Sequence, residues 1–200
     1  MRQLALGISP PPEPSLDNFV PGDNAELLAR LRELKAGSLA ESIVYIWGEP
    51  GCGRSHLLRA CAGPGVVVAD DVDAFDEAQQ IGLFNRINEA RESRTAVLAA
   101  GSAPPAQLAV REDLRSRLAW GLVYQVRPLS DAARAVYLAA EADRRGMRLA
   151  DDVVWYLLAH VRRDLPSLGG ILDLLDRTSL EQQRHITLPL VRETLKTLDE

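Results

Sequence analysis

The chain has 200 residues, 23 basic and 28 acidic, which gives a net charge of −5, and 46% of its residues are hydrophobic. This composition predicts one α/β domain with a small attached subdomain. The acidic balance excludes a broad phosphate-neutralising surface, so we expect DNA to be contacted only locally or indirectly. No leader and no apolar run of roughly 18 residues is present, which predicts a cytoplasmic protein without a membrane partner.

The first 17 residues are predicted to be a flexible tether, because their four prolines remove helix and ladder hydrogen bonds. Gln3 is followed by the apolar residues Leu4, Leu6 and Ile8 in alternation. This pattern is typical of a short linear peptide that fills a pocket on a partner. A disordered terminus with scattered leucines explains the same residues, so the pattern alone leaves both interpretations open.

A β-rich apolar run over residues 43–47 leads into a glycine-rich turn and then a helix that begins near Arg54. This order of strand, loop and helix predicts a P-loop, in which backbone N–H groups and the helix N-terminus bind the phosphates of ADP or ATP. Arg54 stands where lysine is usual, so we expect nucleotide binding to persist and rapid hydrolysis to be less certain. The predicted nucleotide-binding residues of this loop are Gly48, Glu49, Pro50, Gly51, Cys52, Gly53, Arg54, Ser55 and His56.

The segment before the P-loop strand contains a helical pattern over residues 25–36, preceded by Val20 and Pro21. These two residues would line an adenine pocket if the segment lies near the P-loop. A plain turn that starts the helix explains them equally well.

Residues 66–71 read as a buried strand that ends in Asp70 and Asp71. In a P-loop protein such acids bind Mg²⁺ and orient the attacking water. We therefore predict Ser55 and Asp70 as the Mg²⁺ ligands and Asp71 as the residue that orients or deprotonates water.

A helix over residues 76–92, with Ile81, Phe84 and Ile87 on one stripe, and a strand over residues 95–100 come next. Ser102 follows this strand and is either a γ-phosphate sensor or an ordinary turn residue. Arg117 lies in a short helix before the strand 122–126, and it is either a solvated helix charge or a side chain that projects into a neighbouring subunit's nucleotide.

Everything after Pro128 is predicted to be helical, with Ser130 as a helix cap, Gly146 as a helix stop and Asp151 at the next helix start. The chain should therefore consist of a tether (1–17), a nucleotide-binding core (18–127) and an all-α lid (128–200). Arg163 and its neighbour Arg162 could reach phosphates when the lid closes.

The motifs at residues 19–24, 53–58, 116–121, 128–131 and 186–191 together resemble the AAA+ module of the bacterial replication initiator (DnaA) family, and within it the Hda-type regulators. This resemblance covers nearly the whole chain. It implies a P-loop AAA+ parallel sheet with a small helical lid, and regulatory inactivation of DnaA in the control of replication initiation.

The resemblance also implies roles for individual residues. Residues 3–8 are similar to a sliding-clamp-binding peptide, Arg117 matches the family's arginine finger and Arg163 matches sensor II. DnaA and the sliding clamp would be the partners, with DNA reached only through the clamp. The finger would act in trans on ATP held by DnaA, while the bound ADP of this chain would be structural.

Two departures from the family pattern affect this expectation. Only a Gly-Pro-Gly turn at residues 63–65 stands where the family inserts another strand and helix, which predicts a four-stranded sheet without its usual edge strand. Ser102-Ala103 also replaces a usual Asp-Arg pair. A self-contained ATPase of the helicase-loader or clamp-loader type and a degenerate nucleotide-binding scaffold remain the alternatives.

Overall fold

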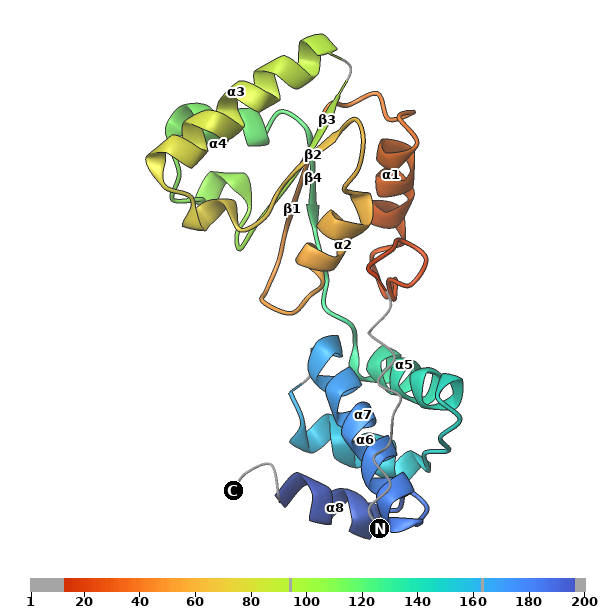
Figure 1. The fold of residues 1–200 in the computed structure, drawn as a ribbon. Helices are drawn as coiled ribbons and strands as arrows, with labels where there is room; N and C mark the ends of the chain where they lie inside the picture. The colour runs from red at the N-terminus through yellow and green to blue at the C-terminus, as the bar shows by residue number, and fades with distance from the viewer. Residues whose placement is uncertain (1–12, 94, 163, 197–200) are drawn as a thin grey trace. The chain divides into compact units, whose positions relative to one another are not determined.

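The computed structural model describes residues 13–93, 95–162 and 164–196 of the chain. The chain divides between Pro128 and Leu129 into two compact units, the core before this point and the lid after it. The core contains the sheet and the lid contains four helices (Figure 1).

A parallel sheet of four strands forms the centre of the core: β1 (Ile43–Trp47), β2 (Val66–Ala69), β3 (Ala96–Gly101) and β4 (Leu122–Gln125). The strand order is β2-β3-β1-β4, and every neighbouring pair runs parallel. The two inner strands are apolar along almost their whole length because helices cover both of their faces. The prediction of four parallel strands is confirmed.

Helices cover the two faces of the sheet (Figure 1). On one face lie α1 (Ala25–Lys35) and α2 (Arg54–Cys61), whose leucines pack against Val44 and Ile46 of β1. On the other face lie α3 (Glu77–Ser93) and α4 (Glu112–Leu118). Short 3₁₀ turns, η1 (Val72–Ala74) and η2 (Pro105–Gln107), follow β2 and β3. The result is a three-layer α/β core.

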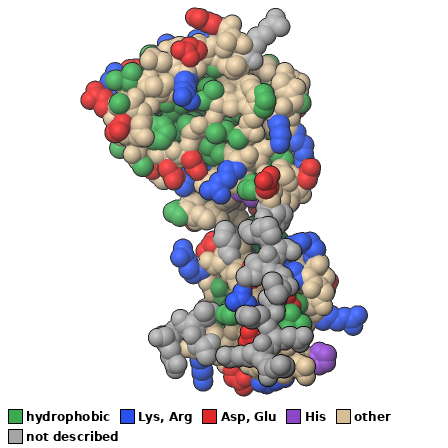
Figure 2. All heavy atoms as spheres, in the orientation of Figure 1, with side chains coloured by type: hydrophobic (Ala, Val, Ile, Leu, Met, Phe, Trp, Pro, Cys, Tyr) green, Lys and Arg blue, Asp and Glu red, His purple; other side chains and the backbone are tan. Residues whose placement is uncertain are grey.

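The strand β2 differs from its prediction as a buried strand. Three of its four residues are half-buried or exposed, and the Val68 side chain is 37% exposed. The reason is its position at the edge of the sheet, where no further described strand pairs with it. Hydrophobic side chains accordingly reach the surface of the core (Figure 2).

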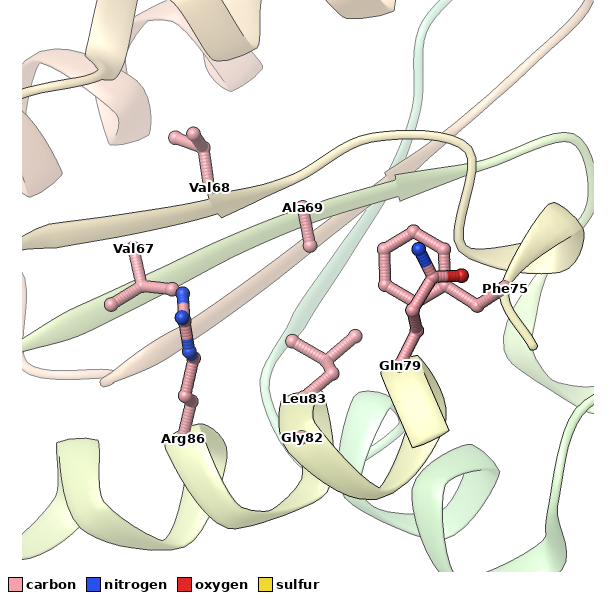
Figure 3. Close-up of a pocket in the computed structure, with 8 residues that line it drawn as sticks. All are labelled: Val67, Val68, Ala69, Phe75, Gln79, Gly82, Leu83 and Arg86. Atoms are coloured by element: carbon pink, nitrogen blue, oxygen red, sulfur yellow. The ribbon is translucent and has the colours of Figure 1, made fainter. Parts of the chain in front are cut away.

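An open groove of ≈ 240 Å³ lies between β2 and α3 (Figure 3). Val67 and Ala69 point from β2 towards α3, whereas Val68 points to the opposite side. Leu83 rises from the helix into the groove, and Arg86 lies alongside Val67. None of the predicted site residues lines this groove.

The predicted apolar stripe of α3 is wrong at one position. Leu83, Ile87 and Ala90 are buried against the sheet, whereas the Ile81 side chain is 41% exposed. Ile81 and Ile87 are six residues apart, which places them about 120° apart around the helix. Only one of the two isoleucines can therefore face the sheet fully.

The lid consists of α5 (Asp131–Arg144), α6 (Asp151–His160), α7 (Leu165–Gln182) and α8 (Leu188–Lys196) around a separate core of leucines and valines. Ser130 caps α5 by accepting a hydrogen bond from the Ala133 amide at 3.2 Å. Asp164 caps α7 in the same way, accepting from the Ser167 amide at 2.9 Å. The predicted start of α6 at Asp151 agrees with the structure.

Candidate nucleotide site and arginine edge

The loop from Gly48 to Gly53 joins the carboxyl end of β1 to the start of α2. The first amides of α2 have no partners within the helix, so they point out of its N-terminus and favour an anion there. Gly53 has φ +105°, and a Cβ at this position would lie 2.7 Å from the Phe19 ring. Glycine is therefore required at the last loop position, both for the backbone conformation and for space.

Arg54, the first residue of α2, carries a charge that is almost removed from solvent. Its side chain is only 11% exposed, and its Nη2 lies 3.4 Å from the Asp71 carboxylate. Its Nη1 is buried and has no hydrogen-bond partner among the described residues. A buried donor without an acceptor is costly, so this position fits an anionic oxygen such as that of a nucleotide phosphate.

Three acids follow the carboxyl end of β2. Asp71 has φ 46°, an uncommon conformation outside glycine, and its amide donates to Asp70 at 3.0 Å. Asp73, in η1, accepts hydrogen bonds from the Ser102 amide at 3.0 Å and from the Ser102 hydroxyl at 2.8 Å. Partial burial acts to raise the pKa of Asp73, but these hydrogen bonds outweigh it and lower the pKa. Asp73 thus ties the turn after β2 to the end of β3.

The phenol of Tyr45, in the middle of β1, forms a second tie within the core. The residue is fully buried, and its hydroxyl donates to the Ala103 carbonyl at 2.7 Å. Burial raises the pKa of Tyr45 far above its usual value, with the Asp73 charge acting in the same direction. Neither Tyr45 nor Asp73 was predicted as a functional residue, although a tyrosine inside an apolar strand signals a buried hydroxyl that needs a partner.

Ser15 and Phe19 contact the start of α2, and Leu16 is buried in the core, so the last residues of the predicted flexible tether (1–17) are packed against the core. The Phe19 and His56 rings are 5.5 Å apart, and His56 Nε2 lies 2.9 Å from the Ser15 carbonyl. Val20 is half-buried and Pro21 is exposed. The segment is thus held beside the P-loop, where an adenine pocket was predicted.

Asn24 fixes the same segment to the end of the sheet. Its buried side chain donates to the Arg127 carbonyl at 2.9 Å and accepts from the Arg127 amide at 2.8 Å. The helix α1 begins at the next residue, yet the Asn24 side chain does not cap it. Its bonds to the Arg127 backbone instead hold the turn before α1 against the segment after β4.

The predicted Mg²⁺ ligands are the Ser55 hydroxyl and the Asp70 carboxylate, both half-buried. No group of three or more His, Cys, Asp or Glu residues suited to a metal occurs in the described part of the chain. Two oxygen donors fit a Mg²⁺ that takes its remaining ligands from phosphate and water. Both cysteines are free, and burial raises the pKa of Cys61 to about 11, so this thiol stays protonated at neutral pH.

Arg117 lies in the last turn of α4, just before the amino end of β4. Its guanidinium carbon is 3.8 Å from the centre of the Trp120 ring and 5.4 Å from that of Phe84. Its Nε is buried and has no hydrogen-bond partner among the described residues. The side chain as a whole is half-buried, so it lies at the surface of the core.

Some predicted site residues lie outside the described part of the chain. These are the peptide residues Gln3, Leu4, Leu6 and Ile8, together with Arg163. The neighbouring Arg162 is described, and its Nε lies 3.4 Å from the Asp164 carboxylate. Among the helices described, none is both long enough and apolar enough to cross a membrane.

A family model described as the Hda lid domain matches residues 131–195. Among solved structures, domain III of the replication initiation protein DnaA of Thermotoga maritima superposes with a TM-score of 0.76 at 20% identity, covering 94% of this chain and 97% of that one. DnaA of Aquifex aeolicus bound to AMPPCP gives a TM-score of 0.71 at 21% identity, covering 87% and 69%. The Thermotoga maritima RuvB Holliday junction branch migration motor gives 0.72 at 16% identity, covering 94% and 72%.

Proposed function

Because this chain is an AAA+ protein related to Hda and DnaA, we propose that it is a regulator that stimulates hydrolysis of ATP bound to DnaA. In this proposal Arg117 is the arginine finger that enters the nucleotide site of DnaA. The protein acts in the cytoplasm, and through DnaA it limits the initiation of DNA replication. Its own nucleotide, which we propose to be ADP, stabilises the P-loop and is not turned over rapidly.

The observation that carries this proposal is the separation of Arg117 from the chain's own P-loop. All four strands are parallel, so their carboxyl ends share one edge of the sheet and their amino ends share the other. The P-loop follows the carboxyl end of β1, whereas Arg117 precedes the amino end of β4. A five-residue strand spans about 15 Å, so this guanidinium cannot reach a phosphate bound by its own subunit.

The state of the Arg117 side chain also supports a role in trans. It forms no ion pair with any carboxylate of the described residues, and its Nε has no acceptor. The charge is therefore free to bind an anion brought by another molecule. Arginine fingers in other NTPases raise the hydrolysis rate by about 10³- to 10⁵-fold, so this single side chain suffices for the proposed effect.

The contact between Arg54 and Asp71 supports slow hydrolysis by the chain itself. Asp71 is the residue predicted to orient or deprotonate the attacking water, and its carboxylate is already engaged by the Arg54 guanidinium at 3.4 Å. When nucleotide and Mg²⁺ are bound, the metal neutralises phosphate charge. Ser55 and Asp70 would hold the metal, and the P-loop amides and Arg54 would bind the phosphates.

The peptide Gln3, Leu4, Leu6 and Ile8 would bring the protein to the sliding clamp on DNA. The alternation of apolar residues suits an extended peptide in a pocket of the clamp. DNA is then contacted only through the clamp, in agreement with the net charge of −5. We also propose Arg163 as sensor II, the role that the family resemblance gives it.

The first experiment measures hydrolysis of DnaA-bound ATP in the presence of clamp-loaded DNA. Arg117→Ala should reduce the stimulation by about 10³-fold or more, whereas Arg86→Ala, an exposed arginine on the same face of the sheet, should leave it unchanged. Undiminished stimulation by Arg117→Ala would overturn the proposal. Rapid turnover of ATP by the isolated protein would instead favour the self-contained ATPase.

A second experiment tests the peptide separately. Gln3→Ala combined with Leu4→Ala should abolish retention of the protein on immobilised clamp, and should leave ADP binding unchanged. If the double variant is retained as well as the parent protein, the peptide has no part in clamp binding.

A further inference from the structure

The turn that follows Arg117 is anchored more firmly than a surface turn requires. Leu118 is fully buried, and the Trp120 amide donates to the Arg117 carbonyl at 3.1 Å. A Cβ on Gly121 would lie 2.1 Å from the Ile43 carbonyl oxygen, so this backbone packs directly on the start of β1. The residues on both sides of the Trp120 ring are thus fixed to the core.

Trp120 itself is 55% exposed, an unusual position for so large an apolar ring. The Arg117 guanidinium carbon lies 3.8 Å from its centre, and that of Arg91 lies 5.2 Å from it. Neither arginine is paired with a carboxylate of the described residues. The exposed ring therefore serves as a contact surface for cations, and the anion that would neutralise them is not supplied by this part of the chain.

We propose that Trp120 is the positioning residue of the finger: its ring holds the Arg117 guanidinium in a fixed orientation, with the help of Phe84, before a partner's phosphate arrives. This inference rests on the proposed function and adds to it the residue that sets the geometry of the finger. A planar guanidinium stacks on an aromatic face better than an ammonium does.

The physical gain is preorganisation. Arginine has four rotatable side-chain bonds, and a free side chain must lose this freedom when it enters the partner's site. A guanidinium that already lies on the ring loses less, and it still presents its outer N–H groups. The buried Nε has no acceptor in the described part of the chain, which fits a side chain that is held by ring contacts and not by a hydrogen bond.

Arg91 adds positive charge to this site but does not orient the Arg117 guanidinium. It lies near the end of α3, close to the amino end of β3, and therefore at the same edge of the sheet as Arg117. Two guanidinium groups near one ring repel each other weakly in water and attract a polyanion such as a triphosphate. Its effect should accordingly depend on salt, whereas the effect of Trp120 should not.

The test compares Trp120→Phe with Trp120→Leu. Both are apolar, but only phenylalanine keeps an aromatic face for the guanidinium. In the assay of DnaA-bound ATP hydrolysis, Trp120→Leu should lower the maximal stimulated rate by about 5- to 30-fold without changing the concentration that gives half of it. Trp120→Phe should restore most of the rate, and Trp155→Leu, at an exposed lid tryptophan, should have no effect.

The outcomes separate the two proposals. If Arg117→Ala abolishes stimulation while Trp120→Leu keeps the full rate, the finger stands and the positioning role is wrong. If Trp120→Leu raises only the half-maximal concentration, the ring is a docking contact and the positioning role is again wrong. If Arg117→Ala keeps the full rate, the proposed function itself fails.

A second measurement does not depend on DnaA. In a protein that retains Trp120 as its single tryptophan, through Trp47→Phe and Trp155→Phe, Arg117→Ala should change the emission intensity, whereas Arg86→Ala should not. Unchanged emission in Arg117→Ala would show that the guanidinium does not rest on the ring in solution, and would overturn the inference even if Trp120→Leu does not fold.

Discussion

Two arginines at opposite edges of the same sheet occupy contrasting environments. Arg54 lies at the carboxyl edge, is 11% exposed and pairs with Asp71. Arg117 lies at the amino edge, is half-buried and rests on an aromatic ring without any acid partner among the described residues. In the proposed function, the Arg54 guanidinium therefore serves the chain's own nucleotide site, and the Arg117 guanidinium serves another molecule.

This difference shows why residue type alone does not define the role of an arginine. Both side chains have one buried nitrogen that finds no hydrogen-bond partner among the described residues. In the proposed function, a phosphate in the P-loop of the same chain would be the acceptor for Arg54. At Arg117 the buried Nε lies against the aromatic rings, and the outer N–H groups would bind an anion from another molecule. The predictions below test whether the two edges act separately.

The largest expected effect comes from Gly53→Ala at the carboxyl edge. A left-handed conformation costs about 1–3 kcal/mol for other residues, and the added Cβ meets the Phe19 ring at 2.7 Å. The affinity for ADP should fall by roughly 30- to 1,000-fold, measured by fluorescence titration or by ligand-induced thermal shift. Gly63→Ala, where the added Cβ would have no neighbour within 4 Å, is the control and should bind ADP normally. Normal binding by Gly53→Ala would mean that the loop rearranges to bind the ligand.

Arg54→Ala should have the next largest effect. Loss of a charge-assisted hydrogen bond costs about 1.5–3 kcal/mol, so the ADP affinity should fall by roughly 10- to 100-fold. Arg117→Ala should leave this affinity unchanged, because Arg117 lies at the other edge of the sheet. Equal losses in the two variants, measured by calorimetric titration, would contradict the separation of the two edges.

A moderate effect is expected from Asn24→Ala, which removes two hydrogen bonds to the Arg127 backbone. Unsatisfied buried partners should lower the free energy of unfolding by about 1–2 kcal/mol, seen as a lower midpoint in urea. The exposed Asn85→Ala on α3 is the matched control. In the protein that retains Trp120 as its single tryptophan, neither change should alter the emission, since Asn24 belongs to the carboxyl edge. A stability loss as small as that of the control would show that the bond to Arg127 is dispensable.

The smallest effect is expected for Asp73→Asn, and it should depend on pH. Because the pKa of Asp73 is lower in the folded state, its stabilising contribution is present above the unfolded pKa and is lost as the pH falls through the folded pKa. The variant should be less stable by about 0.5–1 kcal/mol at pH 7, and the difference should shrink as the pH falls through the lowered pKa of Asp73 in the folded state. Asp23→Asn provides the control in thermal melts from pH 3 to pH 8. A difference that stays the same at every pH of the melts would point to lost packing instead of lost charge.

The elements with strong local signals were predictable from the sequence. The apolar run of β1, the glycines before Arg54, and the stops and caps near Ser130, Gly146 and Asp151 each specify local structure by short-range chemistry. The four-stranded sheet also followed from the sequence, because a three-residue turn at residues 63–65 leaves no room for another strand.

Features that depend on position in the fold were not predictable in the same way. The apolar residues of β2 read as a buried strand, but burial of a strand depends on its neighbours in the sheet, and β2 lies at the edge. Ile81 has an apolar side chain typical of a core residue, yet its position around the axis of α3 directs this side chain away from the sheet.

The candidate site also contains parts that a local motif predicts and parts that depend on contacts between distant residues. The loop from Gly48 to Arg54 is contiguous in sequence and was recognised by its motif. The bond from Asn24 to Arg127 joins residues 103 positions apart, and that from Ser102 to Asp73 joins residues 29 apart. No local sequence pattern predicts contacts between such distant residues. The contact between Arg91 and the Trp120 ring is unpredictable for the same reason.

The short edge strand β2 affects how the protein behaves at high concentration. An unpaired strand edge is a template for association between molecules, and longer, flatter edges aggregate more readily. In β2 only four residues have a free edge to which another strand could pair. The Gly-Pro-Gly turn at residues 63–65 prevents the strand from starting earlier in the chain. Brevity thus protects the sheet from aggregation, and replacing Pro64 with a β-branched residue would remove that protection.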